Sequence, residues 1–288
     1  MGEKPDVGRA GGQQYPVLKA IQTFLQQMAE GNVATEPAVI KELLQNADDA
    51  GASELTVVLD ERQPRDGLRG AAGRYAPLLA PALLVYNNAP FYICQKCRNA
   101  PGGCECLKRD DFCAIRDVAA ANKRAQATAA GRFGLGFNSV YWLTDTPMLF
   151  SRREVHVFDL LHSIFDDNGW QFPLDDFRGD SASKAGIIKC VLEWCFPKKA
   201  LFCDRSFAEL AAAPDGDYEN TIFRLPLRQT ESASPAVDER RFHSPDERLA
   251  LLHSMADEAA RSVLFVKLDF CHFSRPMRPH RERPTGTA

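Results

Sequence analysis

Residues 39–51 read VIKELLQNADDAG, a stretch that combines a strong helix signal with an unusual set of polar side chains. An α-helix turns by about 100° per residue, which gathers the apolar residues of this stretch on one face. Glu42, Asn46 and Asp49 then form a row along the border between the apolar and the solvent-facing sides. Gly51 is placed to adopt the left-handed conformation that often follows a helix end. The stretch therefore predicts a helix with a polar row at the edge of the core.

The polar row has two interpretations. An acid, an amide and an acid spaced i, i+4 and i+7 can converge on one ligand or on a hydrated metal ion. An ordinary amphipathic helix with a polar fringe gives the same spacing. The spacing alone leaves both interpretations open.

Composition narrows the classes of protein. The chain has 288 residues, 45% of them hydrophobic and 25% charged, which fits one large domain or two small ones. A net charge of -3 gives no electrostatic reason to bind nucleic acid or an anionic membrane. The N-terminus lacks a signal-peptide pattern and no run of eighteen apolar residues occurs. Nine cysteines without a secretion signal favour reduced thiols or metal ligation, so we expect an intracellular, cytoplasmic protein.

The order of predicted elements indicates an α+β fold. Helices are predicted at 14–30, 39–50, around 110–124 and at 245–262, and strands at 54–60, 81–86, 148–150, 155–160, 186–195, 220–227 and 263–268. Residues 61–80 are predicted to form a loop, residues 1–13 a flexible N-terminus and residues 275–288 a disordered tail. This order favours helices packed on one face of a mixed, mostly antiparallel sheet.

A second motif lies at residues 131–137, GRFGLGF. Gly131, Gly134 and Gly136 allow a ligand to approach the backbone closely. The helix predicted to follow offers unpaired N–H groups to an anion, for which phosphate is the natural candidate. A structural turn would also account for the glycines, and the chain lacks the GxxxxGK[ST] pattern of a P-loop.

Four segments in this order, ELLQNADDAG, LLVYNNAPF, GRFGLGFNSVYWLTDTP and TIFRLPLR, resemble the sacsin-type ATP-binding module of the GHKL superfamily. The resemblance runs from about residue 14 to 268 and implies one domain over residues 14–274 with the Bergerat α/β sandwich. It implies magnesium-dependent binding of ATP or ADP, slow hydrolysis, and a chaperone or protein quality-control role with client proteins or co-chaperones as partners. A non-catalytic interaction module with a degenerate nucleotide pocket is the alternative. A fragment of a longer protein is one interpretation of a chain that ends soon after its last predicted strand, and the sequence indicates no oligomeric state.

The resemblance also assigns roles to residues. It implies that Glu42 is the general base for the attacking water, that Asn46 holds magnesium and that Asp49 lies near the nucleoside. It places Thr221 near the adenine. Backbone amides that contact the phosphates are implied at Gly131, Gly134, Gly136 and Phe137.

One position departs from the family pattern. The strand that ends in LLVYNNAPF has Asn87 where most GHKL enzymes have an aspartate that accepts a hydrogen bond from the adenine amino group. Ala89 and Phe91 replace the glycines that follow it. An amide can present its NH₂ group as well as its oxygen, so the sequence does not fix the preference for adenine.

Residues 91–108 form a cysteine-containing insert relative to the family pattern. Cys94, Cys97, Cys104 and Cys106 could hold zinc in a four-thiolate site, because a C-x2-C pair is a common ligand arrangement. The second pair is more tightly spaced than in a usual zinc ribbon. A flexible insert or an artefact of gene prediction is the alternative.

Overall fold

The computed structural model describes residues 36–98, 110–116, 136–178, 186–198, 203–229, 244–262 and 270–277. Several predictions made from the sequence lie outside these ranges: the flexible N-terminus, the helix at 14–30, the strand at 263–268, Gly131, Gly134, Cys104 and Cys106. The side chain of Cys97 is also outside the described part of the chain.

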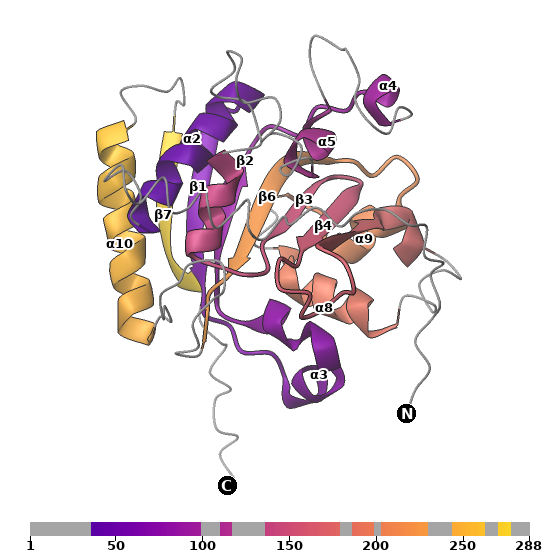
Figure 1. Cartoon of the computed structure of the whole chain (residues 1–288). Helices are drawn as coiled ribbons and strands as arrows, with labels where there is room; N and C mark the ends of the chain where they lie inside the picture. The colour runs from indigo at the N-terminus through magenta and orange to yellow at the C-terminus, as the bar shows by residue number, and fades with distance from the viewer. Residues whose placement is uncertain are drawn as a thin grey trace, which may run out of the picture.

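Within the described residues, one open sheet of seven strands runs through the molecule in the order β5-β4-β3-β6-β2-β1-β7 (Figure 1). The strands are β1 (Glu54–Asp60), β2 (Ala82–Asn87), β3 (Met148–Arg152), β4 (Glu154–Phe158), β5 (Gly169–Pro173), β6 (Tyr218–Pro226) and β7 (Phe270–Met277). Strands β1 and β7 pair in parallel, and all other neighbours pair antiparallel. The predicted α+β class and the mostly antiparallel sheet are confirmed.

The long helices α2 (Val39–Ala50) and α10 (Pro245–Ser262) cover one face of the sheet, as predicted, together with the 3-10 helices η1 (Glu36–Ala38) and η3 (Gly136–Trp142). Helix α2 ends as expected, because Gly51 has φ 81° and its N–H donates to carbonyl groups of the last turn. Side chains of alternate strand residues, such as Leu83 and Val85 of β2, pack against these helices in the first core.

A second core lies on the opposite face of the sheet, where Leu84 of β2 points. It is covered by α8 (Ile187–Cys195), α9 (Phe207–Ala212), α3 (Asp66–Ala71), η2 (Gly73–Leu79) and η4 (Leu174–Phe177). The prediction of a strand at 186–195 is wrong, because these residues form α8. The prediction of a loop at 61–80 is wrong in part, because α3 and η2 occupy most of it. The second face thus has a helical cover that the sequence did not predict.

Smaller differences concern the ends of elements. Strand β7 reaches Met277, so the first three residues of the predicted tail at 275–288 belong to the sheet. Helix α5 (Asp111–Arg116) forms the described part of the helix predicted around 110–124, and α4 (Gln95–Arg98) lies within the insert.

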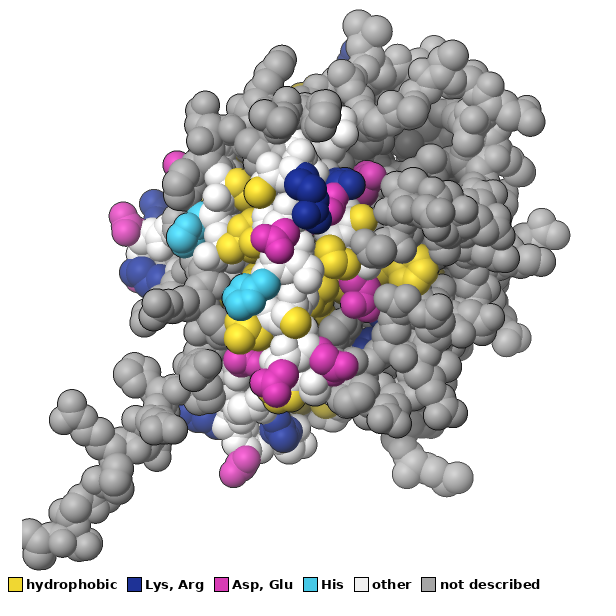
Figure 2. All heavy atoms as spheres, turned by 90° about the vertical axis from the view of Figure 1, so that its left-hand side faces the viewer, with side chains coloured by type: hydrophobic (Ala, Val, Ile, Leu, Met, Phe, Trp, Pro, Cys, Tyr) yellow, Lys and Arg dark blue, Asp and Glu magenta, His cyan; other side chains and the backbone are white. Residues whose placement is uncertain are grey.

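The outer side of α10 faces the viewer in Figure 2, where acidic, basic and histidine side chains surround a few apolar ones. Its inner side buries Leu251, Leu252 and Met255 in the first core. Glu258 of α10 forms an ion pair with Lys41 of α2, which links the two long helices, and a second ion pair with Arg261 of its own helix. Among the helices that the structure describes, none has both the length and the apolar character needed to cross a bilayer.

Candidate nucleotide site

The polar row of α2 begins the candidate site, and its three members differ in exposure. Glu42 is half-buried, Asp49 is exposed, and Asn46 is only 7% exposed. Within the described part of the chain, the Nδ2 atom of Asn46 is buried and has no hydrogen-bond partner. A buried donor without a partner costs about 1–3 kcal/mol. The cost is offset if a ligand or water occupies the adjacent space.

Glu42 faces the start of η3, which packs on α2. A Cβ atom at position 136 would overlap Oε2 of Glu42 and would lie 3.2 Å from its Cδ atom. The carboxylate of Glu42 therefore occupies the space that a side chain at Gly136 would need. Burial raises the pKa of Glu42 above its ordinary value of 4.5. The structure brings two predicted site residues, from α2 and from the glycine motif, into direct contact.

Ser139 of η3 adds a second unsatisfied polar atom to this region. Its Oγ atom is buried and has no hydrogen-bond partner within the described residues. Sequence analysis did not single out Ser139, although it lies in the GFNSVY part of the second motif. Phe137, two residues before it, places its ring in the first core, with centroids 5.3 Å from Phe158 and 5.7 Å from Phe223.

The predicted adenine end of the site lies where β2, β3 and β6 adjoin. The register pairs Asn87 with Thr221, and Thr221 with Ser151. The hydroxyl of Thr221 donates to the carbonyl oxygen of Ala89 at 2.8 Å and lies 2.9 Å from Oγ of Ser151. The N–H of Ala89 donates to Oδ1 of Asn87 at 3.1 Å. The two polar side chains predicted to contact adenine, Asn87 and Thr221, therefore both form hydrogen bonds with the backbone of Ala89.

The side chain of Phe91 is buried at the same end of the candidate site. It is 2% exposed, its ring lies 4.9 Å from that of Phe112 and 6.3 Å from that of Phe223, and its N–H donates to Oγ of Ser151. A glycine at this position, as in the family pattern, would leave that volume empty. Ser151 was missed by sequence analysis because only the register of β3 against β6 reveals its place.

Cys94 is the one predicted zinc ligand whose side chain the structure describes. This side chain is buried, and the backbone N–H of Cys94 donates to Oδ2 of Asp110 at 2.9 Å. Among the described residues, no group of three or more His, Cys, Asp or Glu side chains is arranged to hold a metal ion. The other three predicted ligands lie outside that set, so zinc binding stays a prediction.

Comparison with known proteins shows which family the chain belongs to. The family model of the sacsin domain matches residues 18–96 and 104–268, and the break between the two segments falls inside the predicted insert. Human sacsin is 29% identical over 262 residues, which cover 90% of this chain and 5% of that protein. The chain thus spans about a twentieth of the length of this relative. Since the model matches well over half of the residues, the chain belongs to the sacsin domain family.

Proposed function

We propose that this domain binds ATP or ADP together with magnesium and hydrolyses ATP slowly, in the manner of the GHKL superfamily that its motifs resemble. The observation that carries the proposal is the contact between the Glu42 carboxylate and Gly136, one helical turn from Asn46, whose buried Nδ2 atom has no hydrogen-bond partner among the described residues. A half-buried carboxylate and a buried amide NH₂ group without a partner among the described residues both cost free energy on folding. A phosphate group with its metal ion and water would satisfy both.

The donor set of Asn46 fits this group. An amide oxygen is a ligand that magnesium accepts, and the metal ion usually keeps several waters when it bridges phosphates. The NH₂ group of the same side chain, which lacks a partner within the described residues, can donate to a phosphate oxygen or to a metal-bound water. Magnesium, when bound, would neutralise part of the phosphate charge.

Glu42 fits the role of general base. A carboxylate within reach of a water in line with the terminal phosphate can orient this water and accept its proton. Burial raises the pKa of Glu42, which makes its carboxylate a stronger base. The α2 backbone fixes Glu42 and Asn46 one turn apart, so both side chains address the same ligand.

The cellular role that we propose is support of protein folding or quality control, through conformational change that follows the nucleotide state. This part rests on the family resemblance, and client proteins or co-chaperones are the partners it suggests.

Calorimetric titration of the purified chain with ADP and with ATP, each with and without magnesium, tests the binding. We expect saturable binding that needs magnesium and that is lost in Asn46→Ala. Gln45→Ala is the matched control, since Gln45 is the neighbouring amide on the exposed side of α2. Equal affinity of Asn46→Ala and the parent would contradict the site.

A second candidate function is that of a non-catalytic interaction module, and the closed adenine end favours it. Asn87 and Thr221 are engaged in internal hydrogen bonds, and Phe91 fills the adjoining volume. If folded protein gives no heat with millimolar nucleotide, this second function becomes the better account.

A further inference from the structure

The 3-10 helix η3 begins at Gly136, in the candidate site, and an arginine from a distant part of the chain binds its other end. Arg228 follows β6, and its Nη1 atom donates to the carbonyl oxygen of Trp142 at 2.7 Å. Its Nη2 atom donates to the carbonyl oxygen of Tyr141, also at 2.7 Å. The last carbonyl groups of a helix have no partner within the helix, and a cation at this end complements the helix dipole. Arg228 therefore caps the end of η3.

The guanidinium group of Arg228 is itself fixed by a carboxylate. Its Nε atom donates to Oδ2 of Asp145 at 3.1 Å, and its Nη2 atom to Oδ1 at 2.8 Å, so that the two planar groups meet as a bidentate pair. The side chain of Arg228 is 6% exposed and that of Asp145 is 22% exposed, so water competes little for these bonds. Asp145 lies three residues after Trp142. The pair thus joins the end of β6 to the segment that follows η3.

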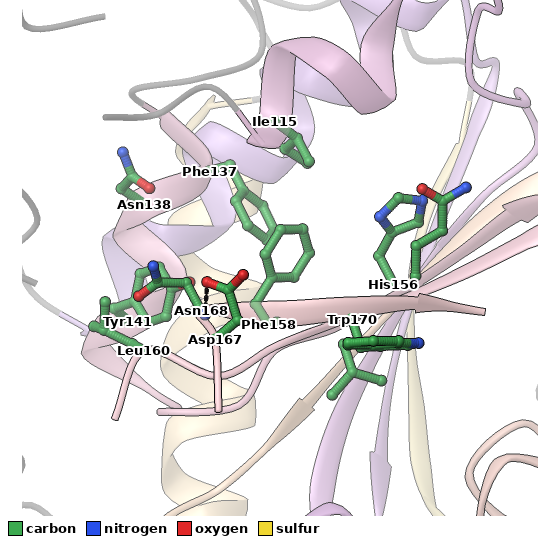
Figure 3. A pocket seen from close by; sticks show the side chains of 13 residues that line it. Ile115, Phe137, Asn138, Tyr141, His156, Phe158, Leu160, Asp167, Asn168 and Trp170 are labelled. Atoms are coloured by element: carbon green, nitrogen blue, oxygen red, sulfur yellow. Dashed lines mark hydrogen bonds between the residues drawn. The ribbon is translucent and has the colours of Figure 1, made fainter. Parts of the chain in front are cut away.

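The rest of η3 transmits the position of this end to the site. Phe137 packs in the first core, and Asn138 and Tyr141 line a cavity beside η3 (Figure 3). Gly136 is in contact with the carboxylate of Glu42 on α2. Seven residues with a rise of about 2.0 Å each place the two ends of η3 about 12 Å apart. A displacement of the last turn therefore moves Gly136 relative to α2.

We infer that Arg228 is a positioning residue: together with Asp145 it fixes the end of η3, and η3 in turn holds Gly136 against the Glu42 carboxylate. The catalytic part of this inference rests on the proposed function, in which Glu42 is the general base. A misplacement of about 1 Å can slow a reaction by roughly a hundredfold, even when its cause lies far from the reacting atoms. The inference also gives a role to two residues of the motifs YWLTDTP and TIFRLPLR that the proposed function leaves unused.

Arg228→Lys tests the position of Gly136. Lysine keeps the charge but lacks the planar fork, so it cannot bind two carbonyl groups and both carboxylate oxygens at once. Nitrogen-15 labelling of the glycines makes the Gly136 amide observable by NMR, and Gly136→Ala assigns its resonance. We expect this resonance to shift in Arg228→Lys, whereas that of Gly67 in α3 should stay in place. Asp145→Asn should cause a smaller shift, and it serves as the test if Arg228→Lys does not fold.

Steady-state hydrolysis of ATP tests the consequence for the reaction. We expect kcat to fall by roughly tenfold or more in Arg228→Lys and KM to change less, because the position of the base matters most in the transition state. A role in stability alone would leave kcat of the folded variant unchanged. Arg153→Lys is the matched control, since Arg153 also binds a carboxylate, that of Asp175 at 2.9 Å, and a carbonyl group, that of Ala213 at 3.0 Å, neither of which belongs to η3.

The outcomes distinguish this inference from the proposed function. An unchanged Gly136 resonance in both Arg228→Lys and Asp145→Asn overturns the inference, whether or not the parent hydrolyses ATP. If the parent is active, a parental kcat in Arg228→Lys overturns it as well. A shifted Gly136 resonance in a protein whose parent form shows no hydrolysis supports the link from Arg228 to Gly136 and contradicts the proposed function instead.

Discussion

At the scale of single residues, Glu42 is the proposed general base, and the burial of its charged carboxylate lowers the stability of the fold. Its folded-state pKa lies above 4.5, so the native state holds the proton more tightly than the unfolded chain. The stability of the native state therefore falls as pH rises through the raised pKa. Glu42→Gln removes the charge with little change in size. We expect this variant to lose hydrolysis by roughly a hundredfold or more, to keep nucleotide binding, and to unfold at a higher temperature than the parent.

Thermal unfolding of Glu42→Gln and the parent at pH 4 and pH 8 measures the stability effect. The gap between them should widen toward pH 8, where the parent carries the buried charge. A gap that is equal at both pH values would show that Glu42 is not desolvated. Turnover at the parental rate would exclude Glu42 as the base.

Gly136 allows a matched test of the same contact. In Gly136→Ala the new Cβ would displace the Glu42 carboxylate, whose flexible side chain can move aside. We expect a small effect on the unfolding temperature and a large loss of hydrolysis. Gly67→Ala is the control, because no atom lies within 4 Å of a Cβ at that exposed helical position. Unchanged hydrolysis in Gly136→Ala would mean that the position of the carboxylate is not critical.

At the scale of elements, the sequence predicted helices and strands correctly where its pattern was clear, and it failed where the same residues suited both a helix and a strand. Helix α2 combines a clear helical period with a glycine at its end, and strand β1 is a short apolar, β-branched run between two acidic residues. Residues 186–195 are rich in β-branched and apolar side chains, which favoured a strand. The buried residues of this segment follow the helical spacing i, i+3, i+4 and i+7: Ile188, Val191, Leu192 and Cys195. Their packing in the second core favours the helix over the strand.

Hydrogen bonds at its N-terminus stabilise the short helix α9. Ser206 accepts from the N–H of Glu209, and Glu209 accepts from the N–H of Ser206, which forms a capping box. We expect Ser206→Ala to lower the free energy of unfolding by about 1 kcal/mol, measured by urea denaturation. Ser163→Ala is not a suitable control, because the Ser163 hydroxyl donates to the buried carboxylate of Asp159. Ser206→Asn is better, since asparagine also caps helices and should retain most of the stability.

The hydrogen bonds that define the capping box also lower the pKa of Glu209, through the Ser206 backbone first. The contribution of Glu209 is therefore present above its ordinary pKa of 4.5 and is lost as pH falls through the lower, folded-state value. An equal denaturation midpoint for Ser206→Ala and the parent at pH 7 would contradict the role of the cap.

At the scale of the whole molecule, the sheet joins two cores, and the candidate site belongs to the first. The helix row and the glycine motif could be read from the sequence, because each is local. The roles of Ser151 and Phe91 could not, because they depend on strands that lie far apart in the chain and pair only in the folded sheet. The same holds for the cavity in Figure 3, of about 360 Å³ over β4 and β5, which is lined by residues of these strands, of α5 and of η3.

The second core contains a buried ion pair that connects the sheet to its helical cover. Asp60 of β1 and Arg224 of β6 both have 0% exposed side chains, and Arg224 Nη1 donates to Asp60 Oδ2 at 2.5 Å. Arg62 also donates to both carboxylate oxygens. The ring of Trp194 in α8 lies 4.7 Å from the Arg62 guanidinium and 4.9 Å from that of Arg224. One carboxylate thus neutralises two cations that contact α8.

Asp60→Asn should therefore destabilise the whole fold, by about 3–5 kcal/mol, because it leaves the buried Arg224 without a counter-charge. Burial acts to raise the pKa of Asp60, but Arg224 and Arg62 outweigh it and hold this pKa below 3.8. The stabilisation is consequently full above pH 3.8 and is lost as pH falls through the folded-state value. Urea denaturation of Asp60→Asn and the parent should differ most near pH 7 and converge in acid, whereas the exposed Asp176→Asn should match the parent throughout. Equal midpoints for Asp60→Asn and the parent at pH 7 would mean that this ion pair does not hold the two layers together.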